Sequence, residues 1–178
     1  MKRDRNSKVR PPLDEAELEQ AALFYAGRYA TTRAKLSSYL ARKLRERGWE
    51  GPVEPPLDAL VERMARLGYV DDRAFASARA AALSRRGYGA GRVEAALRAA
   101  GIAPEDAAGA REIAADGAWE AALRFAERRK LGPFAAARAD RPARAKALAA
   151  MLRAGHPARL ARRILAAGPG EIPEADSR

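Results

Sequence analysis

Apolar residues recur at every third or fourth position along most of the chain, and this spacing predicts amphipathic helices separated by Gly and Pro. No segment alternates β-branched and polar residues, so no strand is expected. One pattern, apolar residues four apart running into a glycine, occurs three times at almost equal spacing: Leu40-x3-Leu44-x3-Gly48, Val93-x3-Leu97-x3-Gly101 and Ala147-x3-Met151-x3-Gly155. A long fixed period is typical of repeat proteins. The sequence therefore predicts an all-α protein of three tandem three-helix repeats in an elongated, curved body.

Turn and capping signals divide the chain further. Asp14 is expected to cap the first helix and Thr31 or Thr32 the second, which Gly48 ends. The predicted segments are a disordered basic arm (1–13), three helical repeats (14–69, 70–116 and 117–168) and a flexible tail (169–178).

Composition narrows the class of protein. Alanine dominates the apolar residues and aromatic residues are only 6%, which favours closely packed helices with thin cores. The chain has no cysteine, no apolar run of about 18 residues and a charged start, so we expect a cytoplasmic protein without a membrane span.

Positive charge is concentrated rather than uniform. The formal net charge is +11, and residues 117–170 alone hold twelve Arg or Lys against three acidic residues. Residues 1–10 are also basic, whereas 52–116 are almost neutral. This asymmetry favours a polyanion or an acidic protein as partner over the alternative of a merely solvated face.

Three motifs with possible chemistry have structural explanations. Asp71-Asp72 fits a helix N-cap better than a metal site. The run Gly87-to-Gly91 lacks the ending of a nucleotide loop and predicts a turn, although a DNA phosphate on the amides near Ala90 or Gly91 stays open. The single His156 has no partner for a catalytic relay nearby in sequence. We expect no catalytic residue, cofactor or metal.

The aromatic residues give a weaker signal. Trp49 and Trp119 are expected in the cores because few large side chains are available to fill them. Tyr25, Tyr29 and Tyr88 stay open as residues on which bases could stack.

The candidate binding residues are Arg and Lys side chains, which suit phosphate or carboxylate equally well. They are Arg33, Lys35, Arg42, Lys43, Arg45, Arg47, Arg85, Arg86, Arg92, Arg128, Arg129, Lys130, Arg141, Arg144, Lys146, Arg153, Arg159, Arg162 and Arg163. No set of base-reading side chains stands out. We therefore expect binding to single- and double-stranded DNA without sequence preference and with strong salt dependence.

A family resemblance rests on two motifs in combination. The stretch Gly68-Tyr69-Val70-Asp71-Asp72-Arg73-Ala74-Phe75-Ala76, followed by Arg85-Arg86-Gly87-Tyr88-Gly89, resembles the RecX family of bacterial regulators of the RecA recombinase. The likeness extends over about residues 15–167, but His156 stands where the family usually has Phe.

The resemblance implies a function as well as a fold. Family members are curved arrays of three-helix repeats that bind along the groove of the RecA–DNA filament. They limit its growth and its recombinase and coprotease activities in DNA repair and the SOS response, and they carry no cofactor. We expect a monomeric, non-enzymatic protein of this kind. The alternatives are a helical DNA-binding module acting as a transcription factor and, less favoured, an enzyme.

Overall fold

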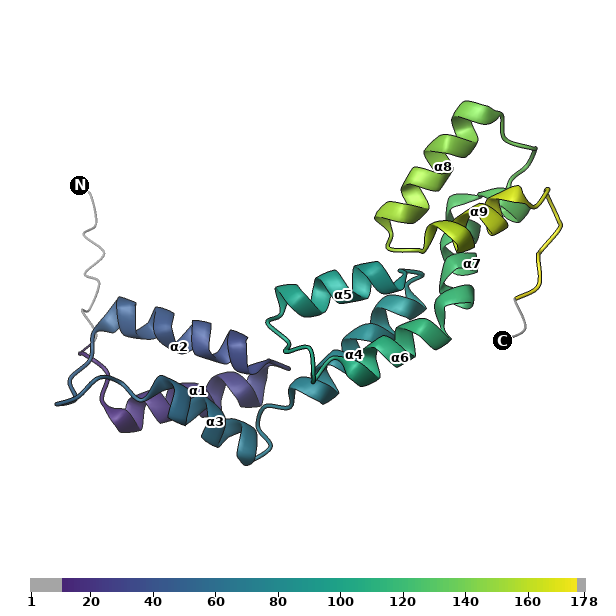
Figure 1. Cartoon of the computed structure of the whole chain (residues 1–178). Coiled ribbons are helices and arrows are strands. Elements are labelled where there is room, and N and C mark those ends of the chain that lie inside the picture. Colours follow the sequence, from purple (N-terminus) through teal and green to yellow (C-terminus); the bar gives the residue numbers. More distant parts are fainter. Residues whose placement is uncertain (1–10, 176–178) are drawn as a thin grey trace, which may run out of the picture. The chain divides into compact units, whose positions relative to one another are not determined.

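The computed structural model describes residues 11–175, and these residues divide into two compact units (Figure 1). The first unit ends at Asp72 and the second begins at Arg73. Residues 11–175 contain helices and turns but no β-strand, which confirms the all-α prediction. The curved shape of the whole chain stays a prediction.

The first unit is a bundle of three helices. Asp14 caps the first, accepting a hydrogen bond from Glu17 N (2.7 Å), and Thr32 caps the second, accepting from Lys35 N (3.2 Å). Both caps satisfy amides that have no partner within their helix, as the sequence predicts. The helices are α1 (Glu15–Arg28), α2 (Arg33–Arg47) and α3 (Leu57–Arg66).

The core of this bundle begins before α1. Leu13, which we expected to belong to the disordered arm, is 2% exposed. Its backbone bonds both Gly48 O and Glu50 N at 3.0 Å, so the chain entering α1 is held against the end of α2. Residues 1–10 of the predicted arm lie outside the described residues. The other buried core residues are Leu18, Ala22, Leu36, Leu40, Leu60, Val61, Met64 and Val70.

The second unit contains two hydrophobic cores. The first belongs to α4 (Asp72–Arg85), α5 (Ala90–Ala99) and α6 (Ala108–Asp116). Six of its ten buried residues are alanine, so these helices approach closely while burying little side-chain area. The second core belongs to α7 (Ala118–Arg129), the 3₁₀ turn η1 (Gly132–Phe134), α8 (Arg141–Arg153) and α9 (Ala158–Ala166).

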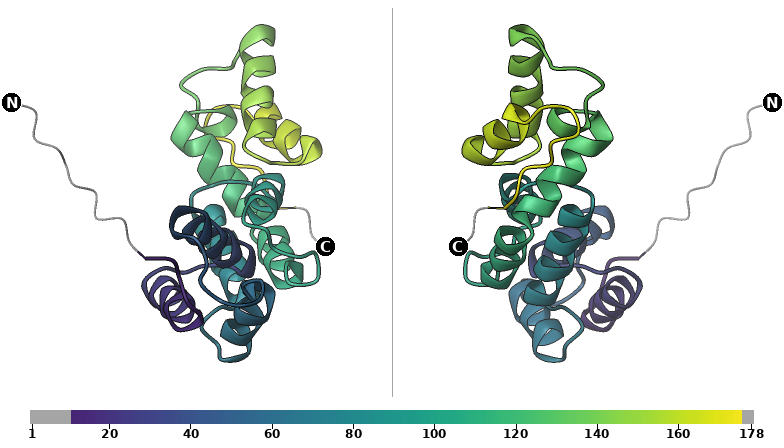
Figure 2. Two further views of the ribbon diagram at one scale, coloured as in Figure 1. Left: turned by 90° about the vertical axis from the view of Figure 1, so that its left-hand side faces the viewer. Right: turned by 90° about the vertical axis from the view of Figure 1, so that its right-hand side faces the viewer.

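The two halves of the second unit meet through backbone atoms. Gly89 N–H donates to Ala154 O (2.9 Å) and Gly91 N–H donates to Gly155 O (3.0 Å), so the start of α5 rests on the end of α8 (Figure 2). A Cβ on Gly89 would lie 2.3 Å from Gly155 O, and one on Gly155 would lie 2.2 Å from Arg92 N. Only glycine fits at either position.

His156 completes this contact. Its side chain is 3% exposed, its Nε2 lies 3.2 Å from Gly87 O, and its ring meets the Phe125 ring edge-on with centroids 5.5 Å apart. The bond to a carbonyl requires a proton on Nε2. Among the described residues, the buried Nδ1 has no hydrogen-bond partner. Burial lowers the pKa of His156, and the bond to Gly87 opposes this only partly.

The segment after α9 makes specific contacts, although we expected it to be flexible. Gly170 N–H donates to Pro133 O (2.8 Å), and Arg163 Nη2 donates to Glu174 O (2.5 Å). The Glu171 side chain accepts from Gly168 N at 3.1 Å. Residues 168–174 are therefore held against the third three-helix segment, which is formed by α7, α8 and α9.

We predict that Gly89→Ala will lower the free energy of unfolding by about 3 kcal/mol or more, because the new methyl group would overlap the Gly155 carbonyl. Urea denaturation followed by circular dichroism measures this. The control is Gly27→Ala in α1, where nothing lies within 4 Å of the new Cβ. That change should stabilise the helix by about 0.5–1 kcal/mol. Equal effects of the two changes would contradict the contact.

The lowered pKa of His156 predicts a pH dependence with a definite sign. Below its ordinary value of 6.5 the unfolded chain binds a proton that the folded chain does not. The free energy of unfolding should therefore fall as the pH drops from 7.5 to 5. His156→Phe should lose less stability than the wild type over this interval, as measured by urea midpoints at each pH. A parallel pH dependence of the two proteins would show that His156 does not cause it.

Candidate nucleic-acid and protein interface

The candidate cations of α2 are largely engaged with acidic side chains of the same unit. Arg42 Nη1 lies 2.8 Å from Glu46 Oε1, and Lys43 Nζ lies 3.6 Å from Glu46 Oε2. Hydrogen bonding to Arg42 lowers the pKa of Glu46. Arg47 Nη2 contacts both carboxylate oxygens of Glu17, at 2.9 and 3.0 Å. Much of the positive charge of α2 is therefore neutralised locally.

Arg33, at the first turn of α2, is similarly paired. Its Nε lies 3.2 Å from Glu62 of α3, and its backbone N–H donates to Asp72 Oδ1 at 2.9 Å. Asp72 is 4% exposed and thus places a buried carboxylate at the positive end of α2. The sequence interpretation of Asp71-Asp72 as a helix cap missed this partner, which is distant in the chain. Lys35 also interacts within the protein, whereas Arg45 is exposed and makes no ion pair with residues 11–175.

Two of the three candidates of the second three-helix segment, which is formed by α4, α5 and α6, lie near one tyrosine. The guanidinium carbons of Arg86 and Arg92 lie 5.7 and 5.9 Å from the centre of the half-buried Tyr88 ring. Arg85, the third candidate, is exposed. The amides of Gly89 and Gly91 already donate to Ala154 and Gly155, which leaves the start of α5 less suited to phosphate than the sequence allowed.

The candidates of α8 lie on two sides of the helix. An α-helix turns about 100° per residue, so Lys146 and Arg153, seven positions apart, share the side facing away from buried Met151. Arg141 and Arg144 lie on another side, and Arg144 lines a cavity beside the core. The four residues do not form a single face.

The three arginines of α9 do share a face. Arg159, Arg162 and Arg163 fall within one arc of the helix, opposite buried Ala161. Arg163 is half-buried and lies over the Trp119 ring, 5.1 Å from its centre. Trp119 packs against the core of this segment, as Trp49 does in the first unit.

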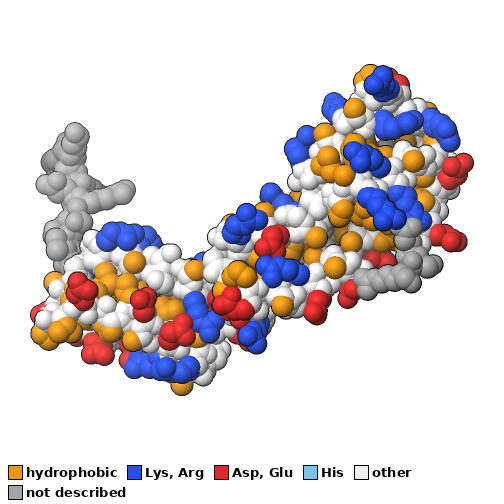
Figure 3. Space-filling view, viewed as in Figure 1, with side chains coloured by type: hydrophobic (Ala, Val, Ile, Leu, Met, Phe, Trp, Pro, Cys, Tyr) orange, Lys and Arg blue, Asp and Glu red, His pale blue; other side chains and the backbone are white. Residues whose placement is uncertain are grey.

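The cations that follow α7 complete the candidate set. Arg128 and Arg129 are exposed, and the guanidinium of Arg129 lies 5.8 Å from the centre of the Phe125 ring. Lys130 ends the helix in a left-handed conformation (φ 53°) and lines the same cavity as Arg144. Figure 3 shows Lys and Arg side chains gathered over α7, α8 and α9.

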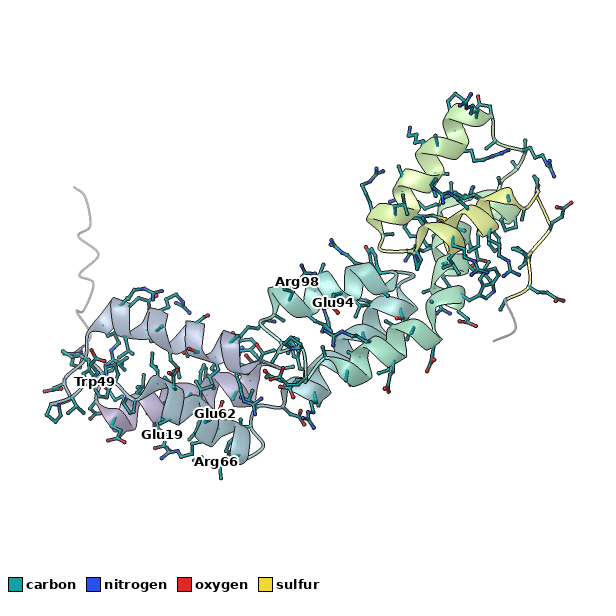
Figure 4. All side chains as sticks on the ribbon, in the orientation of Figure 1. Glu19, Trp49, Glu62, Arg66, Glu94 and Arg98 are labelled. Atoms are coloured by element: carbon teal, nitrogen blue, oxygen red, sulfur yellow. The ribbon has the colours of Figure 1, made fainter. Side chains whose placement is uncertain are left out.

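Acidic side chains are concentrated elsewhere, where they pair with arginines. In the first unit Glu19 of α1 pairs with Arg63 of α3. Figure 4 shows Glu62 of α3 on the same side of this helical bundle as Glu19. In α5, Glu94 accepts from Arg111 of α6 at 3.1 Å, and this bond lowers the pKa of Glu94.

One surface feature was not identified from the sequence. Phe24 is 63% exposed and borders a groove of about 420 Å³ that Tyr39, Lys43 and Arg47 also line. Tyr39 stacks on Tyr25 with ring centroids 4.1 Å apart. The exposed position of Phe24 carried no periodic signal, because a single apolar residue on a polar helix face is common.

Within residues 11–175, no group of three His, Cys, Asp or Glu side chains is placed to hold a metal ion. In the same part of the chain, no helix is long and apolar enough to cross a membrane.

Comparison with known proteins assigns the family. Residues 71–110 match the family model for the second three-helix domain of RecX. The chain is 30% identical over 179 residues to the Regulatory protein RecX of Myxococcus xanthus, covering 94% of each sequence. The crystal structure of RecX from Lactobacillus salivarius shares the fold, with a TM-score of 0.62 and 16% identity over 85% of this chain and 94% of that one. Similarity over 94% of the chain and a shared helical fold thus agree, and the chain belongs to the RecX family of regulatory proteins.

Proposed function

We propose that this protein binds the RecA–DNA filament and inhibits the recombinase and coprotease activities of RecA in DNA repair and the SOS response. It acts in the cytoplasm, by binding and without chemistry of its own. Its membership of the RecX family supports a regulatory role, and the distribution of charge supports attraction to a polyanionic partner.

The observation that carries the proposal is the contrast between paired and unpaired cations. Arg141, Lys146, Arg153 and Arg162 make no ion pair with any of residues 11–175, whereas four of the six candidates on α2 contact a carboxylate. A cation without an internal partner keeps its full charge for phosphate or for an acidic protein surface. The third three-helix segment is therefore the main contact with the filament.

The mechanism is steric. A protein bound along the filament groove occupies the space that an incoming RecA subunit or a homologous DNA strand needs. Arginine and lysine contacts to phosphate carry no base information, so the attraction to DNA is independent of sequence.

We predict that reversing the charge of Lys146, Arg153 and Arg162 to Glu will weaken binding to single-stranded DNA about tenfold or more at low salt. The slope of log affinity against log salt should also fall by about 2, at roughly 0.7 per lost phosphate contact. Fluorescence anisotropy with labelled oligodeoxythymidylate at 50–200 mM salt measures both quantities.

The matched control reverses three exposed arginines outside the candidate set, namely Arg66, Arg79 and Arg98. It has the same net charge and should retain most of the affinity. Equal losses in the two triple variants would show that only total charge matters. Strong discrimination between oligonucleotide sequences would instead favour a transcription factor.

We predict that the wild-type protein will slow RecA-dependent ATP hydrolysis on single-stranded DNA when present below the RecA concentration. The variant with Lys146, Arg153 and Arg162 changed to Glu should need several times more protein for the same inhibition, because long-range attraction to the filament is reduced. The rate of ADP production and the yield of strand exchange measure this.

The variant with Arg66, Arg79 and Arg98 changed to Glu serves as control here also. An undiminished rate of ATP hydrolysis at equal concentrations of RecA and wild-type protein would refute inhibition. Acceleration would assign the opposite sign of regulation.

A further inference from the structure

A cavity of about 180 Å³ lies beside the core of the third three-helix segment. Its walls are the connection between α7 and α8, the first turns of α8, and the end of α9 with the residues that follow it. Buried Ala147 and Leu165 form part of its apolar surface. The volume is below the roughly 300–1,000 Å³ of typical small-molecule sites and suits a single side chain.

Three cations and no acidic residue line this cavity. They are Lys130, Arg138 and Arg144, and all three residues are exposed. None of the three makes an ion pair with residues 11–175, and Arg144 Nη2 bonds only a carbonyl, Ala139 O, at 3.5 Å.

The nearby helix ends do not account for three positive charges. The carboxyl end of α9 contributes about half a negative charge to the wall, and the amino end of α8 opposes it with about half a positive charge. Asp140 lies close by, but its carboxylate accepts from Ala143 N at 2.8 Å as the cap of α8. A positive excess remains at the mouth of the cavity.

The chain itself places an acidic peptide at this mouth. A Cβ on Gly168 would meet the Glu171 carboxylate at 3.1 Å and Arg138 Nε at 3.5 Å, so both groups lie against the same point. The following Ile172 is 59% exposed and is not among the residues that line the cavity. The segment Glu171-Ile172-Pro173-Glu174 thus combines carboxylates with an apolar side chain next to a site with the complementary chemistry.

We propose that this cavity binds an acidic peptide segment of a protein partner. One apolar side chain enters between the alanines, and flanking carboxylates contact Lys130, Arg138 and Arg144. A peptide fits better than nucleic acid, because no aromatic residue lines the cavity to stack on a base. Residues 171–174 act as a tethered competitor for the same cations. The inference goes beyond the proposed function, since it requires neither DNA nor a filament.

The test uses the full-length protein and a fluorescein-labelled peptide with the sequence of residues 168–178. Glu171→Gln in the protein removes the competing carboxylate, so this variant should bind the labelled peptide at least about twofold more tightly than the wild type. In that background, Arg138→Glu with Arg144→Glu should weaken binding about tenfold or more. Changing Ile172 to Ser in the peptide should also weaken binding, because the apolar contact is lost.

The matched control is Lys146→Glu with Arg153→Glu, which changes the net charge of the protein by the same amount. Both of these residues lie on α8 but outside the cavity lining. It should alter peptide affinity less than twofold. Ala143→Phe, which places a ring at an exposed position of the wall, should block the peptide while circular dichroism shows an unchanged fold.

Three outcomes would overturn the proposal. The first is no binding of the peptide to the Glu171→Gln protein. The second is an equal loss of peptide affinity in the cavity variant and in the control variant. The third is a loss of oligodeoxythymidylate binding, rather than of peptide binding, in the cavity variants. The last would assign the cavity to nucleic acid. Each outcome is independent of the RecA assays, in which the cations reversed lie outside the cavity.

Discussion

The contact on which the second unit depends is made by backbone atoms, not side chains. Gly89 and Gly91 at the start of α5 donate to the carbonyls of Ala154 and Gly155, and a methyl group on Gly89 or Gly155 would separate the two surfaces. The same bonds satisfy amides that α5 cannot satisfy internally. A glycine-rich run that suggests a phosphate loop thus joins two three-helix segments. The buried side chain of His156 contacts Gly87 O at the same interface.

The two units differ in how many of their cations are paired with carboxylates, and the net charge of the chain does not reveal this difference. Carboxylates of the first unit hold Arg33, Arg42, Lys43 and Arg47, so this positive charge mainly organises its own helices. In α8 and α9, Arg141, Lys146, Arg153 and Arg162 have no such partners within residues 11–175. Surface ion pairs add little stability, and their main effect here is to decide which cations remain for an external anion.

Local features were predictable from sequence, and distant contacts were not. The caps Asp14 and Thr32 and the glycine that ends α2 follow from interactions within one turn, so spacing alone identified them. The carboxylate of Asp72 at the start of α2, the approach of Gly155 to Arg92, and the bond from Gly170 to Pro133 join residues far apart in the chain. Helical periodicity is enough to place Arg159, Arg162 and Arg163 on one face, but it does not indicate that the α7–α8 connection and α9 enclose a cavity.

The alanine-rich packing of α4, α5 and α6 has a thermodynamic consequence. Because six of the ten buried residues there carry only a methyl group, unfolding exposes little apolar surface for the number of residues involved. The heat capacity change of unfolding, which grows with exposed apolar area, is correspondingly small. Stability in this region then varies gently with temperature, along a broad and shallow curve rather than a sharply peaked one.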